Sequence, residues 1–424
     1  MILESMFMQP EKDYLSAKEA TELLGIKMQT LYAYVSRGMV RSFSGKGTRA
    51  KLYSREDVQR IRLRTMAQAG QVAVAASAMN LGPPIVPTSI TEITPQGPSY
   101  RGQLATDLAL KGATFEQVAE LLWTGLWHET DLLWKASPIT PRDKALLRSI
   151  PAEDARHQLI EILSLVAMQL AIGRGPLKDR LRSGRPLDAA RGVVHGLIGC
   201  FGFLGEGGRY EEAKGGRSVS HSLLVAMSKP VSQEDRRLLD AILVLLADHE
   251  LSPGTFAARI AASAGTSVHS CIAAAIAASS GTEIAERYEW LDEFQKSAKS
   301  TPALISKARK TLSSGQQLPG FNHPLYPAGD PRATVLMDLV RQRSSRPTPV
   351  KHVLALVDHL RMEYDMQPRH ELAVVLACKS MGLPDGAPSA LFVLARTAGW
   401  VAHILEQRLS NTMLRPRAKY SSKI

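Results

Sequence analysis

A polar segment directly after an apolar run holds the first residues that could do chemistry. Residues 247–259 carry His249, two carboxylates and an arginine, and they follow the apolar run 241–246. Polar groups in an apolar helical region cost free energy unless they are paired or used. The simpler interpretation is a helix end, in which Ser252 caps the next helix and Pro253 occupies its first turn.

A second histidine and several arginines in the C-terminal half favour a functional interpretation. His323 follows Gly-Phe-Asn, Arg332 ends an Asp-Pro-Arg sequence, and Arg396 and Arg415 lie further along the chain. Arginines bind carboxylates through paired hydrogen bonds, and histidines can donate to carbonyl oxygens. Together with His249, these residues predict a buried pocket for a small dicarboxylate. The alternative is that the arginines form surface salt bridges.

Composition favours a large helical protein. The chain has 424 residues, enough for two or three domains with a sizeable core. Ala and Leu dominate and β-branched runs are few, which favours helix over strand. The net charge of +12 suits a polyanion or small anionic ligands, although Arg-rich enzymes can have a similar charge.

The cysteines indicate a reducing compartment. Cys200, Cys271 and Cys378 lie in apolar surroundings without a CxxC spacing, so we expect small core residues rather than disulfides. We expect no metal site, because no set of His, Cys and carboxylates has usable spacing. We also expect neither a signal peptide nor a membrane span, and therefore a cytoplasmic protein.

The first seventy residues predict two short helices followed by a hairpin. Ser16 and Glu19 can form a capping box, Gly25 ends that helix, and a second short helix runs over about 27–37. A basic, glycine-rich hairpin is predicted at 42–53, and a further capped helix follows it. This order is typical of a helix-turn-helix with a wing.

The N-terminal segment resembles the winged helix-turn-helix of the mercury-resistance regulator and phage excisionase families. The resemblance is carried by residues 15–40, by the wing and by residues 52–61, and basic residues gather from Arg37 onward. The alternative is a helical module used for self-association. The resemblance implies that the major groove is contacted by Gln29, Thr30, Tyr32 and Arg37. It implies that the DNA backbone is contacted by Arg49 and Lys51.

A proline-rich segment at 80–87 cannot continue a helix, so we place the domain boundary near 70–85. Residues 88–94 alternate and predict a short strand. The rest is predicted to be all-α. Helices are expected at roughly 107–112, 115–128, 141–149, 153–172, 187–205, 217–228, 233–250, 254–279, 283–298, 303–314, 330–344, 347–365, 370–382 and 387–409.

Several segments in order resemble the citrate synthase family. They are Tyr100-Arg101-Gly102, then residues 114–122, 247–263, 320–333, 394–407 and 414–420. The resemblance spans about 88–420 and implies a mainly all-α fold with large and small multi-helix domains. The expected domains are a winged helix-turn-helix at 1–70, a linker at 71–87 and a citrate synthase-like domain at 88–424, whose small subdomain covers about 255–365.

The resemblance also implies residue roles. The family joins acetyl-CoA to oxaloacetate and then hydrolyses citryl-CoA. His249 matches the oxaloacetate ligand, and His323 matches the histidine that polarises the ketone. Arg332 and Arg396 match carboxylate clamps, and Arg415 matches the arginine that reaches across a homodimer. No cofactor is expected, because an acyl-CoA serves as substrate.

Three departures from the family pattern argue against ordinary catalysis. Ile284 falls where the family carries the histidine that stabilises the enol, and isoleucine donates no hydrogen bond. Glu371 falls at the position of the catalytic Asp, so the base would sit one methylene further out. Pro324 and Pro327 replace the two cations that support the CoA phosphates.

Three functions remain open from the sequence. The first is a citrate or 2-methylcitrate synthase, impaired by Ile284. The second is a DNA-binding regulator that senses a dicarboxylate through an inactive synthase domain. The third is a structural partner of a true citrate synthase. Acyl-CoA binding would indicate the first, and salt-sensitive, sequence-specific DNA affinity would indicate the second.

Overall fold

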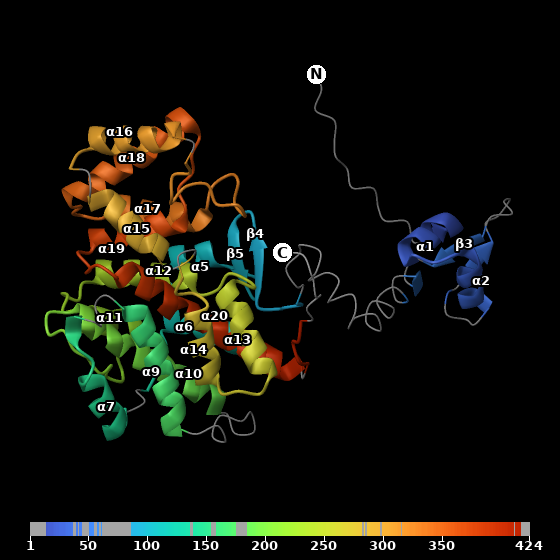
Figure 1. Cartoon of the computed structure of the whole chain (residues 1–424), viewed down its shortest axis with the longest axis horizontal. Helices are drawn as coiled ribbons and strands as arrows, with labels where there is room; N and C mark the ends of the chain where they lie inside the picture. The colour runs from blue at the N-terminus through green and yellow to red at the C-terminus, as the bar shows by residue number, and fades with distance from the viewer. Residues whose placement is uncertain are drawn as a thin grey trace, which may run out of the picture. The chain divides into compact units, whose positions relative to one another are not determined.

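The structure is a computed structural model, and it falls into two units (Figure 1). One unit comprises Met1–Val86 with Arg415–Ile424, and the other comprises Pro87–Leu414. The described residues are 14–36, 40, 42–44, 51–54, 57–58, 61, 86–135, 139–153, 158–174, 185–281, 284, 286–296, 299–314, 316–410 and 412–416.

Among its described residues, the first unit contains helices α1 and α2 and a three-stranded antiparallel sheet of order β1-β3-β2. The predicted capping box is confirmed, because the Ser16 hydroxyl accepts from the Glu19 N–H and the Glu19 carboxylate accepts from the Ser16 N–H at 2.7 Å. Gly25 ends the first helix at φ 63°. The elements are β1 Tyr14–Ser16, α1 Ala17–Leu24, α2 Met28–Ser36, β2 Ser42–Ser44 and β3 Lys51–Ser54.

The predicted DNA-contact residues are divided between described and undescribed parts of this unit. Gln29 and Tyr32 are exposed on α2, Thr30 is half-buried there, and Lys51 is exposed at the start of β3. Arg37 and Arg49 lie outside the described residues, as does most of the predicted linker. The winged helix-turn-helix therefore stays a prediction.

A small sheet precedes the helices of the second unit. Its strands are β4 Thr91–Thr94, β5 Gly97–Tyr100 and β6 Gln103–Leu104, in antiparallel order β4-β5-β6. The predicted strand is confirmed in its second half as β4. Strands β5 and β6 were not predicted from the sequence. Two tight turns allow β5 to pair with both β4 and β6. Gly97 and Gly102 take φ 115° and 86° at those turns.

Helices make up the remainder of the second unit. The predicted helix 254–279 is wrong as a single element, because Gly265 at φ 79° interrupts it and Ser267 caps a new helix. The helices are α5 Ala105–Lys111, α6 Phe115–Thr124, α7 Pro141–Arg148, α9 Leu159–Arg174, α10 Arg185–Cys200, η3 Phe201–Leu204, α11 Val219–Ala226, α12 Gln233–Leu246, α13 Pro253–Ser263, α14 Val268–Ala277, α15 Glu286–Lys296, α16 Thr301–Ser313, α17 Pro331–Gln342, α18 Thr348–Tyr364, α19 His370–Ser380 and α20 Ala387–Ser410.

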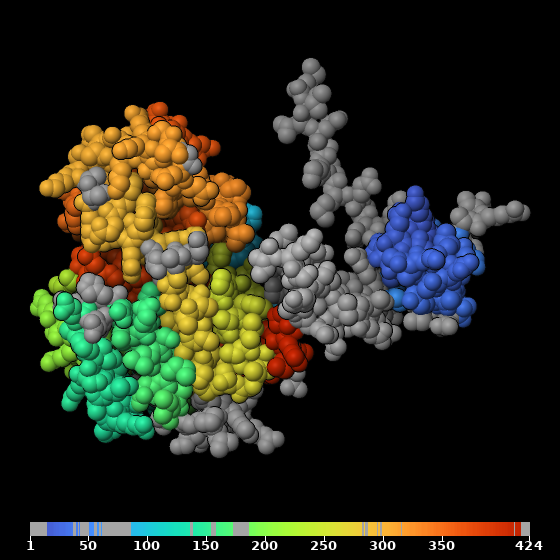
Figure 2. All heavy atoms as spheres, in the orientation of Figure 1, coloured from blue at the N-terminus to red at the C-terminus, as the bar shows by residue number. Residues whose placement is uncertain are grey.

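The long helix α20 organises the core of this unit. It packs against α6, α12, α13 and α14, and it runs through the middle of the unit in Figure 1. Figure 2 shows the orange segments of α16 and α18 at one end of the unit and the green segments of α7 and α9 at the other. Helix α17 packs against α12 and α19, and both α12 and α19 pack against α20.

Two helices are long and apolar enough to cross a membrane. Within the described residues they are Pro186–Leu204, of which 83% is buried, and Ala387–Ser410, of which 94% is buried. Apolar helices buried to this extent inside a fold form its core. The three cysteines are also buried, as expected for small core residues.

Two buried carboxyl groups, one on α6 and one on α12, both accept hydrogen bonds from the start of α11. Glu116 accepts from the Val219 N–H at 2.7 Å through Oε1, while its Oε2 has no hydrogen-bond partner among the described residues. Asp240 on α12 accepts from the Ser220 hydroxyl at 2.8 Å. Burial, with a contribution from Asp240, raises the pKa of Glu116 to about 8.

This raised pKa predicts a pH-dependent stability. A carboxyl group whose pKa is higher in the folded state stabilises the fold fully below its unfolded pKa near 4.5, and the contribution is lost as the pH rises through about 8. The free energy of unfolding of the wild type should fall between pH 5 and pH 9. We expect this fall to be smaller in Glu116→Gln by roughly 3–5 kcal/mol. Urea denaturation at both pH values measures this. The exposed Glu129→Gln serves as control and should follow the wild type, and a Glu116→Gln profile parallel to wild type would contradict the prediction.

Candidate functional site

His249 lies shortly after the end of α12, where hydrogen bonds fix the backbone. The buried hydroxyl of Tyr100 donates to the carbonyls of Val244 and Asp248 at 3.0 and 3.2 Å, and it accepts from the Asp248 N–H at 3.3 Å. Burial raises the pKa of Tyr100 above its ordinary value, so this hydroxyl stays neutral and can both donate and accept. Ser252 and Pro253 do begin the next helix, but the Ser252 hydroxyl bonds the Thr255 hydroxyl instead of the backbone.

Two loops that are far apart in sequence are joined beside α12. Phe321 and Pro368 form an antiparallel bridge. On one side of this bridge, the Asn322 N–H donates to the Gln367 carbonyl at 2.7 Å, and the Gln367 N–H donates to the Asn322 side chain at 2.9 Å. This pairing places the residues around 323 next to those around 370.

The result is a cluster of three histidines and a tyrosine. His249 Nε2 lies 3.0 Å from the Tyr326 hydroxyl. The ring of His323 lies 5.8 Å from that of His249 and 5.9 Å from that of His370, measured between centroids. The structure therefore brings the two predicted histidines together. Sequence reasoning did not assign roles to Tyr326 and His370, although each lies within three residues of a predicted site residue.

Both predicted histidines are neutral. Burial, with Arg332 and Arg396 nearby, holds the pKa of His249 well below its usual range. Burial and Arg332 lower the pKa of His323 to about 4. His323 Nδ1 accepts from the Leu325 N–H at 3.1 Å, so the proton of the neutral ring resides on Nε2. This tautomer can donate a hydrogen bond to a carbonyl oxygen.

Arg332 is buried and already paired. Its Nε and Nη2 donate to the two carboxylate oxygens of Asp330, each at 2.9 Å, and its Nη2 lies 2.9 Å from His370 Nδ1. Asp330 also caps α17 and accepts from the His370 N–H at 3.1 Å. Arg332 holds the pKa of Asp330 well below its usual range against the opposing effect of burial. This unit anchors the starts of α17 and α19 together.

Arg396 is buried on α20 with unused hydrogen-bond donors. It is 3% exposed, and within the described residues its Nε and Nη1 have no hydrogen-bond partner. Its guanidinium lies 5.0 Å over the ring of Phe392. Burial lowers its pKa, while the nearby Asp248 acts in the opposite direction. Unpaired buried donors on a cation are costly unless an anion binds them, so Arg396 fits a carboxylate ligand.

Glu371, the predicted base, is engaged by a neighbouring arginine. Arg369 donates to both of its oxygens, from Nη2 at 2.6 Å and from Nε at 3.1 Å. Burial acts against ionisation, but His370 and Arg369 outweigh it and lower the pKa of Glu371 to about 2. Arg369 supplies the permanent charge, because burial and Arg332 lower the pKa of His370.

Two further predicted residues are Ile284 and Arg415. Ile284 is half-buried, packs against the main apolar core and donates its N–H to the Gly281 carbonyl at 3.0 Å. Arg415 is exposed and belongs to the other unit.

Asp248 is bonded to a largely buried chain of hydrogen-bonded side chains formed by His403, Arg259 and Glu406. The His403 Nε2 donates to an Asp248 oxygen at 3.2 Å, and the His403 Nδ1 accepts from Arg259 at 3.1 Å. Arg259 also donates to Glu406 at 2.6 Å. The predicted cost of burying Arg259 and Asp248 next to His249 is therefore met in part by pairing, although the Asp248 Oδ1 has no hydrogen-bond partner among the described residues. His403 was not singled out from sequence, because its partners lie more than a hundred residues away.

One triad could hold a cation by geometry alone. Ligand atoms of His323, Asp330 and His370 lie within 4.8 Å of one another. However, the Arg332 guanidinium occupies both Asp330 oxygens and lies 2.9 Å from His370 Nδ1. A divalent cation would meet that positive charge, so the triad does not fit a metal.

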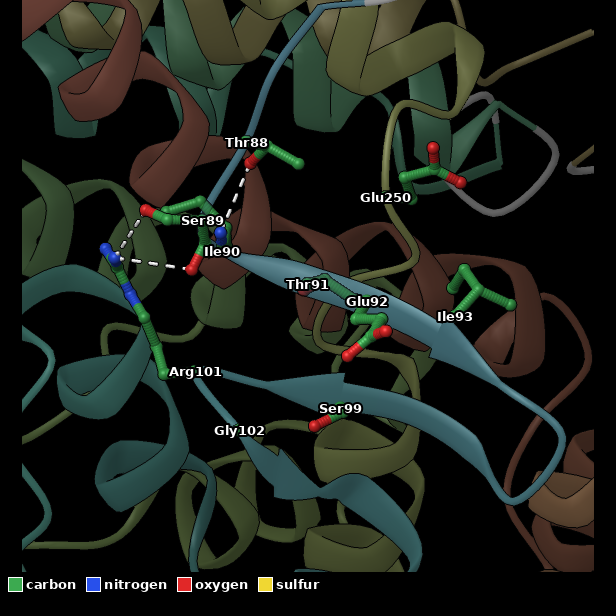
Figure 3. A pocket seen from close by; sticks show the side chains of 10 residues that line it. All are labelled: Thr88, Ser89, Ile90, Thr91, Glu92, Ile93, Ser99, Arg101, Gly102 and Glu250. Carbon is green, nitrogen blue, oxygen red and sulfur yellow. Dashed lines mark hydrogen bonds between the residues drawn. The ribbon is translucent and has the colours of Figure 1, made fainter. Parts of the chain in front are cut away.

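A separate polar cavity lies beside β4. It has a volume of about 550 Å³ and is lined by residues 88–93, Ser99, Arg101, Gly102 and Glu250 (Figure 3). Arg101 points toward Ser89, whose hydroxyl accepts from its Nη1 at 3.1 Å. Glu250 lines this cavity even though it follows His249 directly in the chain. The histidine cluster does not line it.

The sequence matches a known family over most of its length. The model of the family described as citrate synthase, C-terminal domain, matches residues 81–417. The chain belongs to the citrate synthase family. Citrate synthase 2 of Bacillus subtilis is 25% identical over 349 residues, covering 79% of this chain and 92% of its own. The 2-methylcitrate synthase of Shewanella oneidensis is 27% identical over 356 residues, covering 78% and 90%.

Solved structures show the same fold. A citrate synthase from Thermoplasma acidophilum, in a ternary complex with carboxymethyl coenzyme A and oxaloacetate, matches with a TM-score of 0.71 at 23% identity. The match covers 82% of this chain and 96% of that one. The citrate synthase of Thermotoga maritima matches with a TM-score of 0.59 at 23% identity, covering 80% and 94%. The predicted mainly helical citrate synthase-like fold is thus confirmed for the second unit.

Close packing at Gly399 predicts a sensitive position behind the site. A Cβ built there would lie 2.6 Å from Asp248 Cγ and 2.7 Å from the Ala247 carbonyl oxygen, and the Gly399 N–H already donates to that oxygen. We expect Gly399→Ala to lower the unfolding free energy by about 1–3 kcal/mol, because Asp248 must shift. Gly207→Ala is the matched control, since its nearest atoms lie 3.7 Å away. Equal stabilities of the two variants in urea would show that the backbone relaxes freely.

Proposed function

We propose that this citrate synthase-family protein binds oxaloacetate or a similar dicarboxylate in the cluster of His249, His323 and Arg396. The observation that carries the proposal is the buried Arg396, whose Nε and Nη1 have no hydrogen-bond partner among the described residues. Its charge acts on the neutral His249, whose ring lies 5.8 Å from that of the neutral His323. The family reaction is acetyl-CoA plus oxaloacetate plus water giving citrate plus CoA. We place this chain in that reaction class, with a reduced rate.

Each residue has a chemical task in this proposal. Arg396 binds a ligand carboxylate through its free donors, and Arg332, held by Asp330, adds positive charge to the pocket. His323 donates from Nε2 to the ketone oxygen and so polarises the carbonyl, and His249 fixes the ligand's orientation. Glu371 would remove a proton from the methyl carbon of the acyl thioester. Ile284 supplies no donor for the resulting enolate oxygen, which costs about 2.7–4 kcal/mol in the barrier.

The named relatives support both the ligand and the choice of acyl group. The Thermoplasma structure holds oxaloacetate together with a coenzyme A derivative. Relatives of this chain include both citrate and 2-methylcitrate synthases at similar identity. We therefore propose acetyl-CoA and propionyl-CoA as the acyl-CoA substrates to compare.

A homodimer completes the proposal. Leu165, Met168 and Ile172 on α9 are 45%, 42% and 60% exposed, which leaves an apolar stripe on the surface of this unit. Contiguous exposed apolar side chains on a soluble protein mark an interaction surface. In a dimer, Arg415 of one chain would reach the ligand site of the other. We propose a cytoplasmic dimer, tested by its mass in solution.

Ligand-induced stabilisation tests the binding proposal directly. Oxaloacetate at a hundredfold excess over its Kd should raise the unfolding free energy by about 2.7 kcal/mol. Pyruvate, which lacks the second carboxylate, should produce little change at the same concentration. Absence of a melting-temperature shift with millimolar oxaloacetate would overturn the proposal.

Thiol release tests the reaction. We expect slow release of CoA from acetyl-CoA or propionyl-CoA that depends on oxaloacetate, and an increase of about 10²–10³ in Ile284→His. If wild type already turns over at an ordinary rate of about 10 s⁻¹, Ile284 is not an impairment. If wild type is silent while oxaloacetate still stabilises it, the pocket binds without turnover.

The second candidate function is a dicarboxylate-responsive DNA-binding regulator. The N-terminal unit favours it, because α2 follows a capped α1 and presents Gln29 and a 53% exposed Tyr32 to solvent. Arg37 and Arg49 remain predicted contacts there, and Lys51 is exposed on β3. Two such heads in a dimer would bind a palindromic site.

Selection of bound sequences from a random DNA pool tests the second function. A regulator should enrich one palindrome, and its affinity should fall steeply with salt. We expect Lys51→Ala to weaken binding similarly across sequences, and Tyr32→Ala to alter the enriched sequence. Enrichment of no sequence would leave the N-terminal unit as a self-association module.

A further inference from the structure

The carboxylate of Glu371 is held in a fork by an arginine two residues earlier. Arg369 precedes α19 and Glu371 lies in its first turn. The Arg369 Nη2 to Glu371 Oε1 distance is 2.6 Å, and the Arg369 Nε to Oε2 distance is 3.1 Å. Both oxygens therefore accept from one planar guanidinium, which is the strongest geometry for such a pair.

Other charged and titratable groups face the same carboxylate. His370 Nδ1 lies 3.2 Å from Oε2, and Arg287 Nη1 lies 3.8 Å from Oε1. Tyr288, from the same helix as Arg287, is also within electrostatic range, and burial raises its pKa so that it stays neutral. The Glu371 side chain is only 6% exposed, so solvent does little to weaken these interactions.

We propose that Arg369 acts as an intramolecular lock on Glu371, which suppresses proton abstraction while leaving dicarboxylate binding intact. The inference rests on the proposed function and deepens it. A general base works by gaining a proton in the transition state. The forked guanidinium stabilises the charged form of Glu371. Part of this stabilisation is lost when the carboxylate takes up a proton. Arg369 is thus a positioning residue that opposes the reaction.

A purely structural role for the Arg369 side chain is less well supported. The loop at the start of α19 is already fixed by backbone bonds, including the Arg369 N–H to the Gly320 carbonyl at 2.8 Å. Asp330 also accepts from the His370 N–H. A side-chain substitution keeps these bonds. We therefore expect the folded state to survive loss of the guanidinium.

Arg369→Gln tests the lock with full-length protein. We expect the Glu371 pKa to rise from about 2 toward its ordinary value, measured by infrared difference spectra against Glu371→Gln. Oxaloacetate-dependent thiol release should increase about tenfold in kcat, with an unchanged KM for oxaloacetate. The acidic limb of the pH profile of thiol release should move to higher pH. Arg369→Lys keeps the charge without the fork and should lie between the two.

Controls separate this inference from the proposed function. Arg361→Gln removes an exposed arginine whose Nε donates to the Gln367 side chain at 3.0 Å, and it should behave as wild type. If Arg369→Gln leaves the pKa near 2, or lowers thiol release while oxaloacetate still stabilises the protein, the lock is wrong. If oxaloacetate fails to stabilise even the wild type, the binding proposal fails, and the infrared measurement still decides the lock.

Discussion

Replacing Arg396 with methionine should abolish the stabilisation of this protein by oxaloacetate while leaving the protein folded. Arg396 is 3% exposed, and its Nε and Nη1 donate to no described group. A ligand carboxylate would satisfy these donors in surroundings with little water. Removing one member of such a buried charge pair costs about 3 kcal/mol, a loss of roughly 10² in affinity.

The fold should tolerate this change for a specific reason. No described acceptor loses a hydrogen bond from Nε or Nη1, and methionine fills much of the space over the Phe392 ring. Melting temperatures with and without oxaloacetate provide the measurement. Arg341→Met is the matched control, because Arg341 pairs with Asp358 on the surface. An undiminished response in Arg396→Met would remove Arg396 from the binding site.

Replacing Asp330 with asparagine should destabilise the protein by about 3–5 kcal/mol. Asp330 is 1% exposed and is bonded to Arg332 through both oxygens. Asparagine retains one acceptor but presents an amide to the guanidinium, which leaves the buried Arg332 charge without its counter-charge. The cap of α17 and the His370 N–H bond also depend on this carboxylate.

Urea denaturation at neutral pH measures this loss. Asp358→Asn is the control, because Asp358 and Arg341 form a bidentate pair whose side chains are 45% and 38% exposed. Exposed pairs contribute only up to about 1 kcal/mol, so the control should change little. Equal effects of the two substitutions would mean that solvent reaches Asp330 and that the Arg332 unit is not a buried anchor.

Much of the local structure follows from short-range chemistry. The capping box of Ser16 and Glu19 forms as its spacing predicts, because the partners are three residues apart. The structure adds a second capping box at the same spacing, between Thr114 and Gln117. Positions of helices also follow from periodicity. The prediction of a single helix over 254–279 was wrong at Gly265. The Ala-rich sequence there is compatible with a continuous helix, and the helix is interrupted because Gly265 takes a positive φ.

The candidate site was predicted in part. His249, His323 and Arg396 were chosen from residue type and family resemblance, and the structure places the two histidine rings 5.8 Å apart. The tautomer of His323 depends on the Leu325 N–H, which only the loop geometry reveals. Arg332 and Arg396 were both predicted to be carboxylate clamps, yet Arg332 is paired with Asp330 whereas Nε and Nη1 of Arg396 have no hydrogen-bond partner among the described residues.

The sequence alone therefore determined the family, the helical class and the residue types available for binding a dicarboxylate. Only the tertiary structure decided which of those residues are free to act. The Phe321–Pro368 bridge, the Asp248–His403 bond and the unpaired Arg396 join or separate groups that are distant in the chain. A charge's partners, burial and pKa depend on which atoms surround it in space, and spacing along the chain does not contain that information.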